Sequence, residues 1–148
     1  MGKKRITTKT ENKGGIEAET APVVSASKKN VKRQVLKGVA TIFSSYNNTI
    51  VSVTDQKGEV LTWSSSGSLG FKGARKSTPY AATMVARDAL DKARKFNLSE
   101  VSIAVRGIGP GREAAIRAIA GTGLSINALM DNTPIPHGGV RPPKPRRV

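Results

Sequence analysis

The chain has 148 residues, enough for one modest domain, and its 25 Lys and Arg against ten Asp and Glu give a formal net charge of +15. It contains no cysteine and one histidine, which excludes disulfides, a Cys–His pair and the usual metal-ligand clusters, and no apolar run approaches the ~18 residues that span a bilayer. Because a free domain gains nothing from such self-repulsion, we expect a polyanionic partner, nucleic acid rather than a membrane.

Residues 1–37 carry charge without hydrophobic periodicity. They contain ten basic and three acidic residues and are rich in Lys, Thr, Glu and Ser, a composition typical of disordered segments. We therefore predict a mostly disordered arm. Its residues 1–30 fit a solubilising tail as well as an RNA-binding one, whereas residues 28–37, five of them basic, are the expected contact.

The pattern changes at residue 38, where β-branched and small residues begin to alternate. Alternation with a period of two is typical of half-buried strands, and Asn and Gly supply the backbone angles that tight hairpins need. The predicted strands run from Gly38 to a break at Asn47 and Asn48, from Ile50 to Thr54, and from Val60 to Ser65. We expect these three strands to form an antiparallel meander.

A helix is predicted after the glycine-rich basic loop at residues 67–77. Thr78 has the hydroxyl of an N-cap, and Pro79 suits the first helical position. Small apolar residues then recur at spacings of three and four as far as about Phe96. The charged residues off this stripe are expected in solvent: Asp88, Asp91, Lys92 and Arg94.

The rest of the domain is predicted as a strand, a helix and a last strand. The strand covers Val101 to Val105, the helix runs from Glu113 to Ala120 and is closed by Gly121 and Gly123, and the last strand covers Leu124 to Met130. The order βββ-α-β-α-β predicts one α/β domain over residues 38–130, with a mixed sheet whose last strands are joined by crossover helices. Residues 131–148 follow as a proline-rich basic tail.

The sequence holds little that could carry out catalysis. His137 lies in the proline-rich tail without a nearby carboxylate. A two-metal nuclease needs several converging carboxylates, but the acidic residues flank a turn, at Asp55 and Glu59, or are expected on a helix face, at Asp88 and Asp91. We expect a protein that is not an enzyme and that uses no metal or other cofactor.

The segment from Arg106 to Arg112 resembles a phosphate-binding turn. It lies between a predicted strand and a predicted helix, where backbone N–H groups and the helix dipole attract an anion. It lacks the Gly-Lys-Ser/Thr of a P-loop, and Arg112 takes the third glycine position of a dinucleotide fingerprint, so an RNA phosphate is the expected ligand. A plain tight turn would explain Gly107 but neither arginine.

The glycine-rich loop at 67–77 is a second candidate contact. Its glycines would let an RNA backbone come close, its cations supply charge and its aromatic ring could stack on a base. These residues are Gly67, Gly70, Gly73, Lys72, Arg75, Lys76 and Phe71. A solvated loop is the alternative reading. At the hairpin tip, Asn47 and Asn48 could hydrogen-bond RNA or simply form a turn.

The tail combines prolines with positive charge. Prolines at 134, 136, 142, 143 and 145 hold the chain extended and reduce the entropy lost when it is ordered. Arg141, Lys144, Arg146 and Arg147 then project from a stiff ribbon that could follow a groove between RNA helices. We expect RNA to order this segment. A frayed terminus, the alternative, does not explain so many prolines together with so much charge.

Four motifs, NNTIVSVTD, GFKGARKSTPYAA, RGIGPGREAAIRA and DNTPIPHGGVRPPKPRRV, together resemble the bacterial form of the universal small-subunit ribosomal protein eleven family. The resemblance covers residues 38–148. It implies a ribonuclease-H-like mixed α/β domain without nuclease activity, bound to ribosomal RNA at the platform of the small subunit beside other platform proteins. It also implies a place near the messenger exit path, close to the site of messenger pairing. The expected location is a cytoplasmic ribosome, with an organellar ribosome as the alternative.

Charge, glycine content and the resemblance together select the residues that we predict to bind ribosomal RNA. They are Asn47, Asn48, Gly70, Phe71, Lys72, Gly73, Arg75, Lys76, Arg106, Gly107, Gly109, Gly111, Arg112, Pro134, Pro136, His137, Arg141, Lys144, Arg146 and Arg147. The chain departs from the family pattern at residues 137–140, which read His-Gly-Gly-Val where relatives often have His-Asn-Gly-Cys, and at Pro145, which interrupts a basic run. Two other functions stay open: a free-standing RNA-binding regulator or chaperone, and a phosphate-processing enzyme acting at the 106–112 turn.

Overall fold

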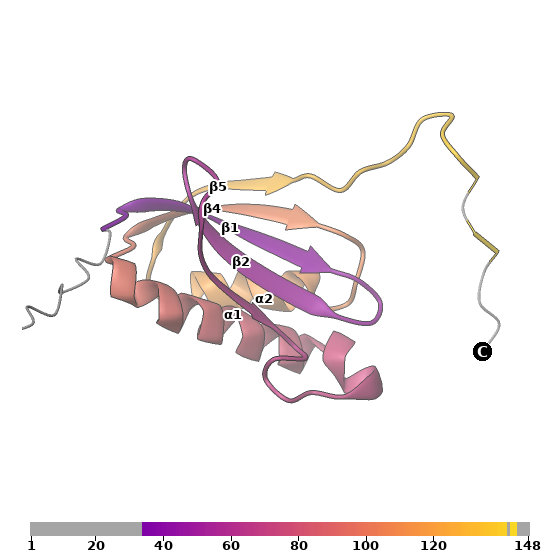
Figure 1. Cartoon of the computed structure of the whole chain (residues 1–148), viewed down its shortest axis with the longest axis horizontal. Helices are drawn as coiled ribbons and strands as arrows, with labels where there is room; N and C mark the ends of the chain where they lie inside the picture. Colours follow the sequence, from indigo (N-terminus) through magenta and orange to yellow (C-terminus); the bar gives the residue numbers. More distant parts are fainter. Residues whose placement is uncertain (1–33, 142, 145–148) are drawn as a thin grey trace, which may run out of the picture. The chain divides into compact units, whose positions relative to one another are not determined.

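The computed structural model describes residues 34–141, 143 and 144 (Figure 1). The predicted arm up to residue 33, and Arg146 and Arg147, lie outside these residues. Within the described part, five strands and two α-helices follow in the order βββ-α-β-α-β, which confirms the predicted mixed α/β class. The elements are β1 (Lys37–Ser44), β2 (Thr49–Asp55), β3 (Val60–Ser65), the 3-10 turn η1 (Gly73–Ser77), α1 (Pro79–Ala93), the 3-10 turn η2 (Arg94–Phe96), β4 (Glu100–Arg106), α2 (Arg112–Ala120) and β5 (Ser125–Asp131).

The strands form one mixed sheet with the order β3-β2-β1-β4-β5. The meander of β1, β2 and β3 is antiparallel, as predicted, whereas β4 lies parallel to β1 and β5 lies parallel to β4. Parallel neighbours need a crossover connection, and the segments that contain α1 and α2 provide it. It follows that β1, β3, β4 and β5 all run in one direction, so that their carboxyl ends share one end of the sheet (Figure 1).

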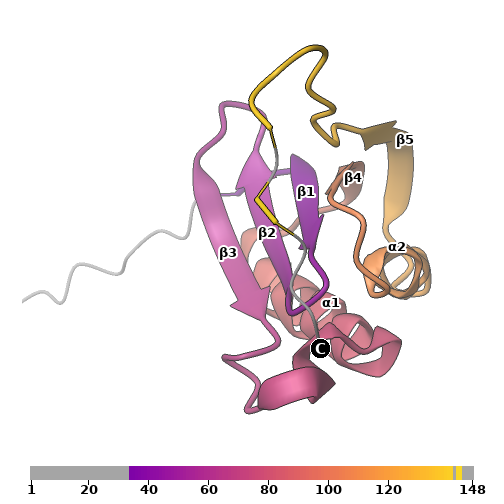
Figure 2. The same ribbon diagram turned by 90° about the vertical axis from the view of Figure 1, so that its right-hand side faces the viewer.

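Both helices cover the same face of the sheet (Figures 1 and 2). The core between the helices and the sheet consists of Ala, Val, Ile and Leu side chains, as expected for a chain with only 4% aromatic residues. The predicted stripe of α1 is buried throughout: Ala82, Val85, Ala86, Ala89, Leu90 and Ala93. The buried apolar side chains of the sheet come from its three central strands: Ala40, Ile42, Val51, Val53, Val101, Ile103, Ala104 and Val105.

Local chemistry sets the start of α1. Thr78 Oγ1 accepts a hydrogen bond from Ala81 N at 3.3 Å, and Pro79 occupies the first helical position, as predicted.

The expectation that Asp88 is fully solvated is wrong, because α1 packs against β3. The Ser64 hydroxyl of β3 donates to the Asp88 carboxylate at 2.6 Å, and Lys92 Nζ lies 2.6 Å from the same oxygen. Burial raises the pKa of Asp88, but the hydrogen bonds from Lys92 and Ser64 outweigh it and hold the pKa below its ordinary value. Asp88 therefore links the middle of α1 to an edge strand of the sheet.

The contacts of the domain begin before Gly38. Val35 is buried, and its N–H donates to the carbonyl oxygen of Phe96 at 2.9 Å. The carbonyl oxygen of Leu36 accepts from the N–H groups of Ser99 and Glu100 at 3.0 and 2.9 Å. These bonds place residues 35–37 with the α/β domain, ahead of the predicted boundary.

The second face of the sheet carries none of the described helices (Figure 2). Phe43 and Trp63 stand on this face and are 41% and 58% exposed. The edge strand β5 is exposed along its whole length. Among the described residues, no helix is long and apolar enough to cross a membrane.

Candidate nucleic-acid interface

All four segments that the sequence singles out lie at the carboxyl end of the sheet (Figure 1). The turn at residues 45–48 follows β1, the glycine-rich loop follows β3, the turn at 107–111 follows β4, and the tail follows β5. Open α/β sheets bind their ligands outside the carboxyl ends of the strands. The topology thus gathers segments that are far apart in the sequence on the end of the fold that most often binds ligands.

The turn between β1 and β2 is held by Ser45. Its Oγ accepts hydrogen bonds from the N–H groups of Asn47 at 3.4 Å and Asn48 at 3.1 Å. Asn48 Oδ1 accepts from Thr49 N at 3.0 Å, which is a turn-forming role. Asn47 is exposed at the tip, so its side chain is the more accessible of the two.

The turn between β4 and α2 packs against the turn between β1 and β2. Gly107 has a φ of +97°, which favours glycine, and Gly109 N donates to Ser44 O at 3.0 Å. An added Cβ would collide with the hairpin of β1 and β2 at all three glycines: 2.2 Å from Ser44 O at Gly107, 2.3 Å from Ser45 O at Gly109 and 2.5 Å from Thr49 Oγ1 at Gly111. The packing of the domain therefore requires these glycines, whether or not a ligand approaches them.

Arg112, at the start of α2, is engaged within the domain. Its Nη1 donates to Gly107 O at 3.1 Å and lies 3.5 Å from Thr133 Oγ1, and its Nη2 pairs with the carboxylate of Asp131 at the end of β5. The side chain is 31% exposed. Arg112 thus ties the 107–111 turn to β5 and to the first residues of the tail, and a phosphate that approached it would compete with Asp131.

Asp131 and Thr133 fasten the beginning of the tail. The Thr133 hydroxyl donates to Asp131 Oδ1 at 2.6 Å and accepts from Gly107 N at 3.2 Å, and Thr133 N donates to Asp131 Oδ1 at 3.0 Å. Hydrogen bonds from the Thr133 hydroxyl, from Arg112 and from Thr133 N lower the pKa of Asp131 to about 2. We call Arg112, Asp131 and Thr133 the tail clamp, because together they hold the chain where it leaves the sheet.

Beyond the tail clamp, the chain lies beside the end of β4. Pro134 and Pro136 line an open pocket together with Arg106 and Gly107, so four of the predicted residues share one site. His137, Arg141 and Lys144 follow with exposed side chains.

The glycine-rich loop has a different character. Gly70 and Gly73 have φ values of +86° and +57°, and nothing lies within 4 Å of an added Cβ at either residue. Lys72 and Arg75 are exposed, and they help to line an open hollow of about 620 Å³. Gly70 and Gly73 therefore allow the backbone to turn, and Lys72 and Arg75 face solvent.

The aromatic ring of the loop has a partner within the domain. Phe71 is half-buried, and its ring centroid lies 6.1 Å from that of Tyr80 with an interplanar angle of 80°. This edge-to-face contact fastens the loop to the first turn of α1. Lys76, within η1, is half-buried as well.

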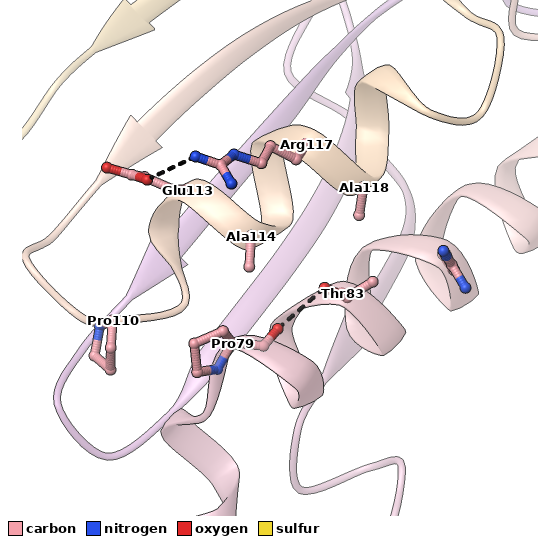
Figure 3. A pocket seen from close by; sticks show the side chains of 8 residues that line it. Pro79, Thr83, Pro110, Glu113, Ala114, Arg117 and Ala118 are labelled. Carbon is pink, nitrogen blue, oxygen red and sulfur yellow. Dashed lines mark hydrogen bonds and ion pairs between the residues drawn. The ribbon is translucent and has the colours of Figure 1, made fainter.

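A groove between α1 and α2 was not singled out by the sequence (Figure 3). It has a volume of about 500 Å³ and is lined by small side chains and charged residues: Pro79, Thr83, Arg87, Pro110, Glu113, Ala114, Arg117 and Ala118. Arg117 Nη2 lies 3.3 Å from Glu113 Oε2, so this arginine is paired within its own helix. Glycine and clustered charge, the signals used above, do not mark this surface, and only the packing of the two helices creates it.

The sequence also missed Phe43, Asp131 and Thr133. Phe43 lies in a strand whose alternating pattern does not set it apart from its neighbours. Asp131 and Thr133 are among the first residues of the predicted tail, where only prolines and basic residues were considered. A search for an acidic partner of Arg112 could have suggested Asp131. The distance between the two along the chain gives no sign of their contact.

Comparison with known protein families matches residues 38–147 to ribosomal protein S11. The match spans nearly all of the described elements and confirms the resemblance carried by the four sequence motifs. The family is one of structural proteins rather than of enzymes. The match covers most of the chain, and exposed basic residues lie at the carboxyl end of its sheet. This protein therefore belongs to the ribosomal protein S11 family of rRNA-binding structural proteins of the small ribosomal subunit.

Proposed function

We propose that this protein binds ribosomal RNA with the carboxyl end of its sheet, at the platform of a small ribosomal subunit. The supporting observation is the convergence of the 45–48 turn, the glycine-rich loop, the 107–111 turn and the tail on that end, although they follow four different strands. With it we propose that the protein supports assembly of the subunit.

Within this interface the residues take two roles. The exposed cations would neutralise phosphates: Lys72, Arg75, Arg106, Arg141 and Lys144, with Lys76 partly accessible and Arg146 and Arg147 completing the tail. Gly70 and Gly73 leave open space for an RNA backbone, and Asn47, Phe71, Pro134, Pro136 and His137 add uncharged contact surface. Gly107, Gly109, Gly111, Arg112 and Asn48 shape the site. Gly109 and Gly111 are buried, whereas RNA would reach Gly107, Arg112 and Asn48 through their exposed atoms.

The finer placement rests on the resemblance of the four motifs to the bacterial form of the family. On that ground we propose a cytoplasmic ribosome, neighbouring platform proteins as partners, and a position near the messenger exit path beside the site of messenger pairing. The open sheet face and the groove between α1 and α2 are surfaces on which protein neighbours could pack.

The proposal is tested by ultraviolet crosslinking in cells, with sequencing of the attached RNA and mapping of the crosslinked peptides. We expect crosslinks in a few segments of small-subunit rRNA, carried by peptides from 67–76, 106–112 and the tail. The exposed surface around Asp91 of α1 and Arg94 of η2, where no RNA contact is predicted, serves as the internal control. Crosslinks spread over many transcripts would instead identify a free-standing RNA-binding protein.

A further inference from the structure

A pocket of about 440 Å³ opens at the carboxyl ends of β1 and β4. After β1 the chain turns to β2, toward one edge of the sheet. After β4 it passes through α2 to β5, toward the opposite edge. Where the connections after two adjacent parallel strands run in opposite directions, a crevice forms between them. This crevice is the usual position of the ligand in open α/β sheets. Here the first residues of the tail return over that crevice and form one of its walls.

The walls of this pocket are apolar and stiff. Phe43 lies on one side, and Pro134, Ile135 and Pro136 lie on the other, with Ile108 from the 107–111 turn. Ile108 and Ile135 are 65% and 74% exposed, although large apolar side chains usually avoid such exposure. The two prolines and the tail clamp restrain the tail wall, so little conformational freedom is left to lose when a ligand enters.

The rim of the pocket is positively charged. Arg106 is the register partner of Phe43 across β1 and β4, so the two side chains stand side by side on the open face of the sheet. Arg106 is exposed. The nearby carboxylate of Asp131 is already paired with Arg112 and hydrogen-bonded to Thr133, which leaves the charge of Arg106 to an incoming anion.

We propose that this Phe43 pocket receives one unstacked nucleobase of an RNA strand, with a phosphate of the same strand on Arg106. The inference rests on the proposed function and specifies how RNA is held at one point of the interface. Bases splayed out of an RNA stack on aromatic and apolar side chains while a neighbouring cation takes the phosphate. An apolar side chain of a protein would also fit the walls, but it would leave the charge of Arg106 without a partner.

The test uses the full-length protein and the small-subunit rRNA segment recovered by crosslinking, with affinities measured over a series of salt concentrations. Phe43→Leu and Ile135→Ser should each weaken binding, Phe43→Leu by roughly 5- to 150-fold, with the salt dependence unchanged. Arg106→Gln should lower the log–log salt slope by about 0.7–0.9. Trp63→Leu is the matched control, because Trp63 is an exposed aromatic residue on the same sheet face but outside the pocket.

Each outcome decides between named alternatives. Wild-type affinity in both Phe43→Leu and Ile135→Ser overturns the pocket while leaving RNA binding intact. Unchanged RNA affinity, combined with loss of a crosslink to a neighbouring ribosomal protein, assigns the pocket to a protein side chain instead. Failure of the wild-type protein to bind small-subunit rRNA counts against the proposed function itself. Should Phe43→Leu fail to fold, Ile135→Ser decides, since its side chain is largely in solvent.

Discussion

The two glycine-rich basic segments of this protein look alike in sequence and differ in structure. In the 107–111 turn, added Cβ atoms would lie 2.2–2.5 Å from atoms of the β1–β2 hairpin, whereas at Gly70 and Gly73 nothing lies within 4 Å. Arg112 is bonded to Gly107, Asp131 and Thr133, whereas Lys72 and Arg75 are exposed. One segment is packed into the domain, and the other has open surroundings and cations exposed to solvent.

The difference shows what glycine and arginine can mean in such a segment. A glycine permits close approach, but the approaching backbone can belong to the same chain or to a ligand. An arginine can neutralise a phosphate or a carboxylate of its own domain. The comparison therefore predicts that substitutions in the 107–111 turn act first on stability and those in the glycine-rich loop act first on RNA binding.

The largest effect is expected from Gly107→Ala. Its Cβ would meet the backbone of Ser44, and its φ is positive, so we expect the free energy of unfolding to fall by at least about 3 kcal/mol. Gly70→Ala is the matched control, because its φ is also positive but its surroundings are open. It should cost about 1–2 kcal/mol. Urea unfolding of both variants measures this, and equal losses would mean that the close packing of the turn contributes nothing.

A smaller effect on the free energy of unfolding is expected from substituting Arg112 of one segment and Arg75 of the other. Arg112→Gln breaks the tail clamp and should lower the free energy of unfolding by about 1–2 kcal/mol, while Arg75→Gln should change it by less than about 0.5 kcal/mol. In RNA binding the order reverses. Arg75→Gln should lower the log–log salt slope by about 0.7–0.9, and Arg112→Gln should leave it unchanged, because Asp131 already neutralises that charge. A reduced slope in Arg112→Gln would show that RNA displaces Asp131.

The smallest effect concerns pH and is confined to the tail clamp. The folded pKa of Asp131 is about 2, below the ordinary 3.8, so its contribution to stability is present above pH 3.8 and is lost as the pH falls through 2. The Thr133 amide resonance in NMR should report this titration, with its midpoint near 2. In Arg112→Gln the midpoint should move toward 3.8, although the Thr133 hydrogen bonds should keep part of the shift. A midpoint near 3.8 in the wild-type protein would mean that the clamp is open in solution.

How much could be read from the sequence depends on the range of each signal. The Thr78 cap and Pro79 lie within one helical turn of the groups they serve, and the buried stripe of α1 repeats every three to four residues, so both were predicted correctly. The bounds of β3 and the order of the elements followed from alternation and turn residues in the same way. The prediction for Asp88 was wrong because its partner Ser64 lies 24 residues away on β3. The periodicity of the helix does not tell which strand α1 packs against.

The sequence by itself thus determined the class of the fold, the elements and the excess of positive charge, since each follows from composition or from contacts within a few residues. Only the tertiary structure decided that β4 pairs with β1, which sets Phe43 beside Arg106 and brings Gly107 against Ser44. It likewise brought Asp131 to Arg112, so that the arginine of one basic segment is engaged within the domain while Lys72 and Arg75 of the other are exposed. The physical reason is that strand register and crossover connections create contacts between distant residues, and no local pattern encodes which of two similar loops will meet its own chain.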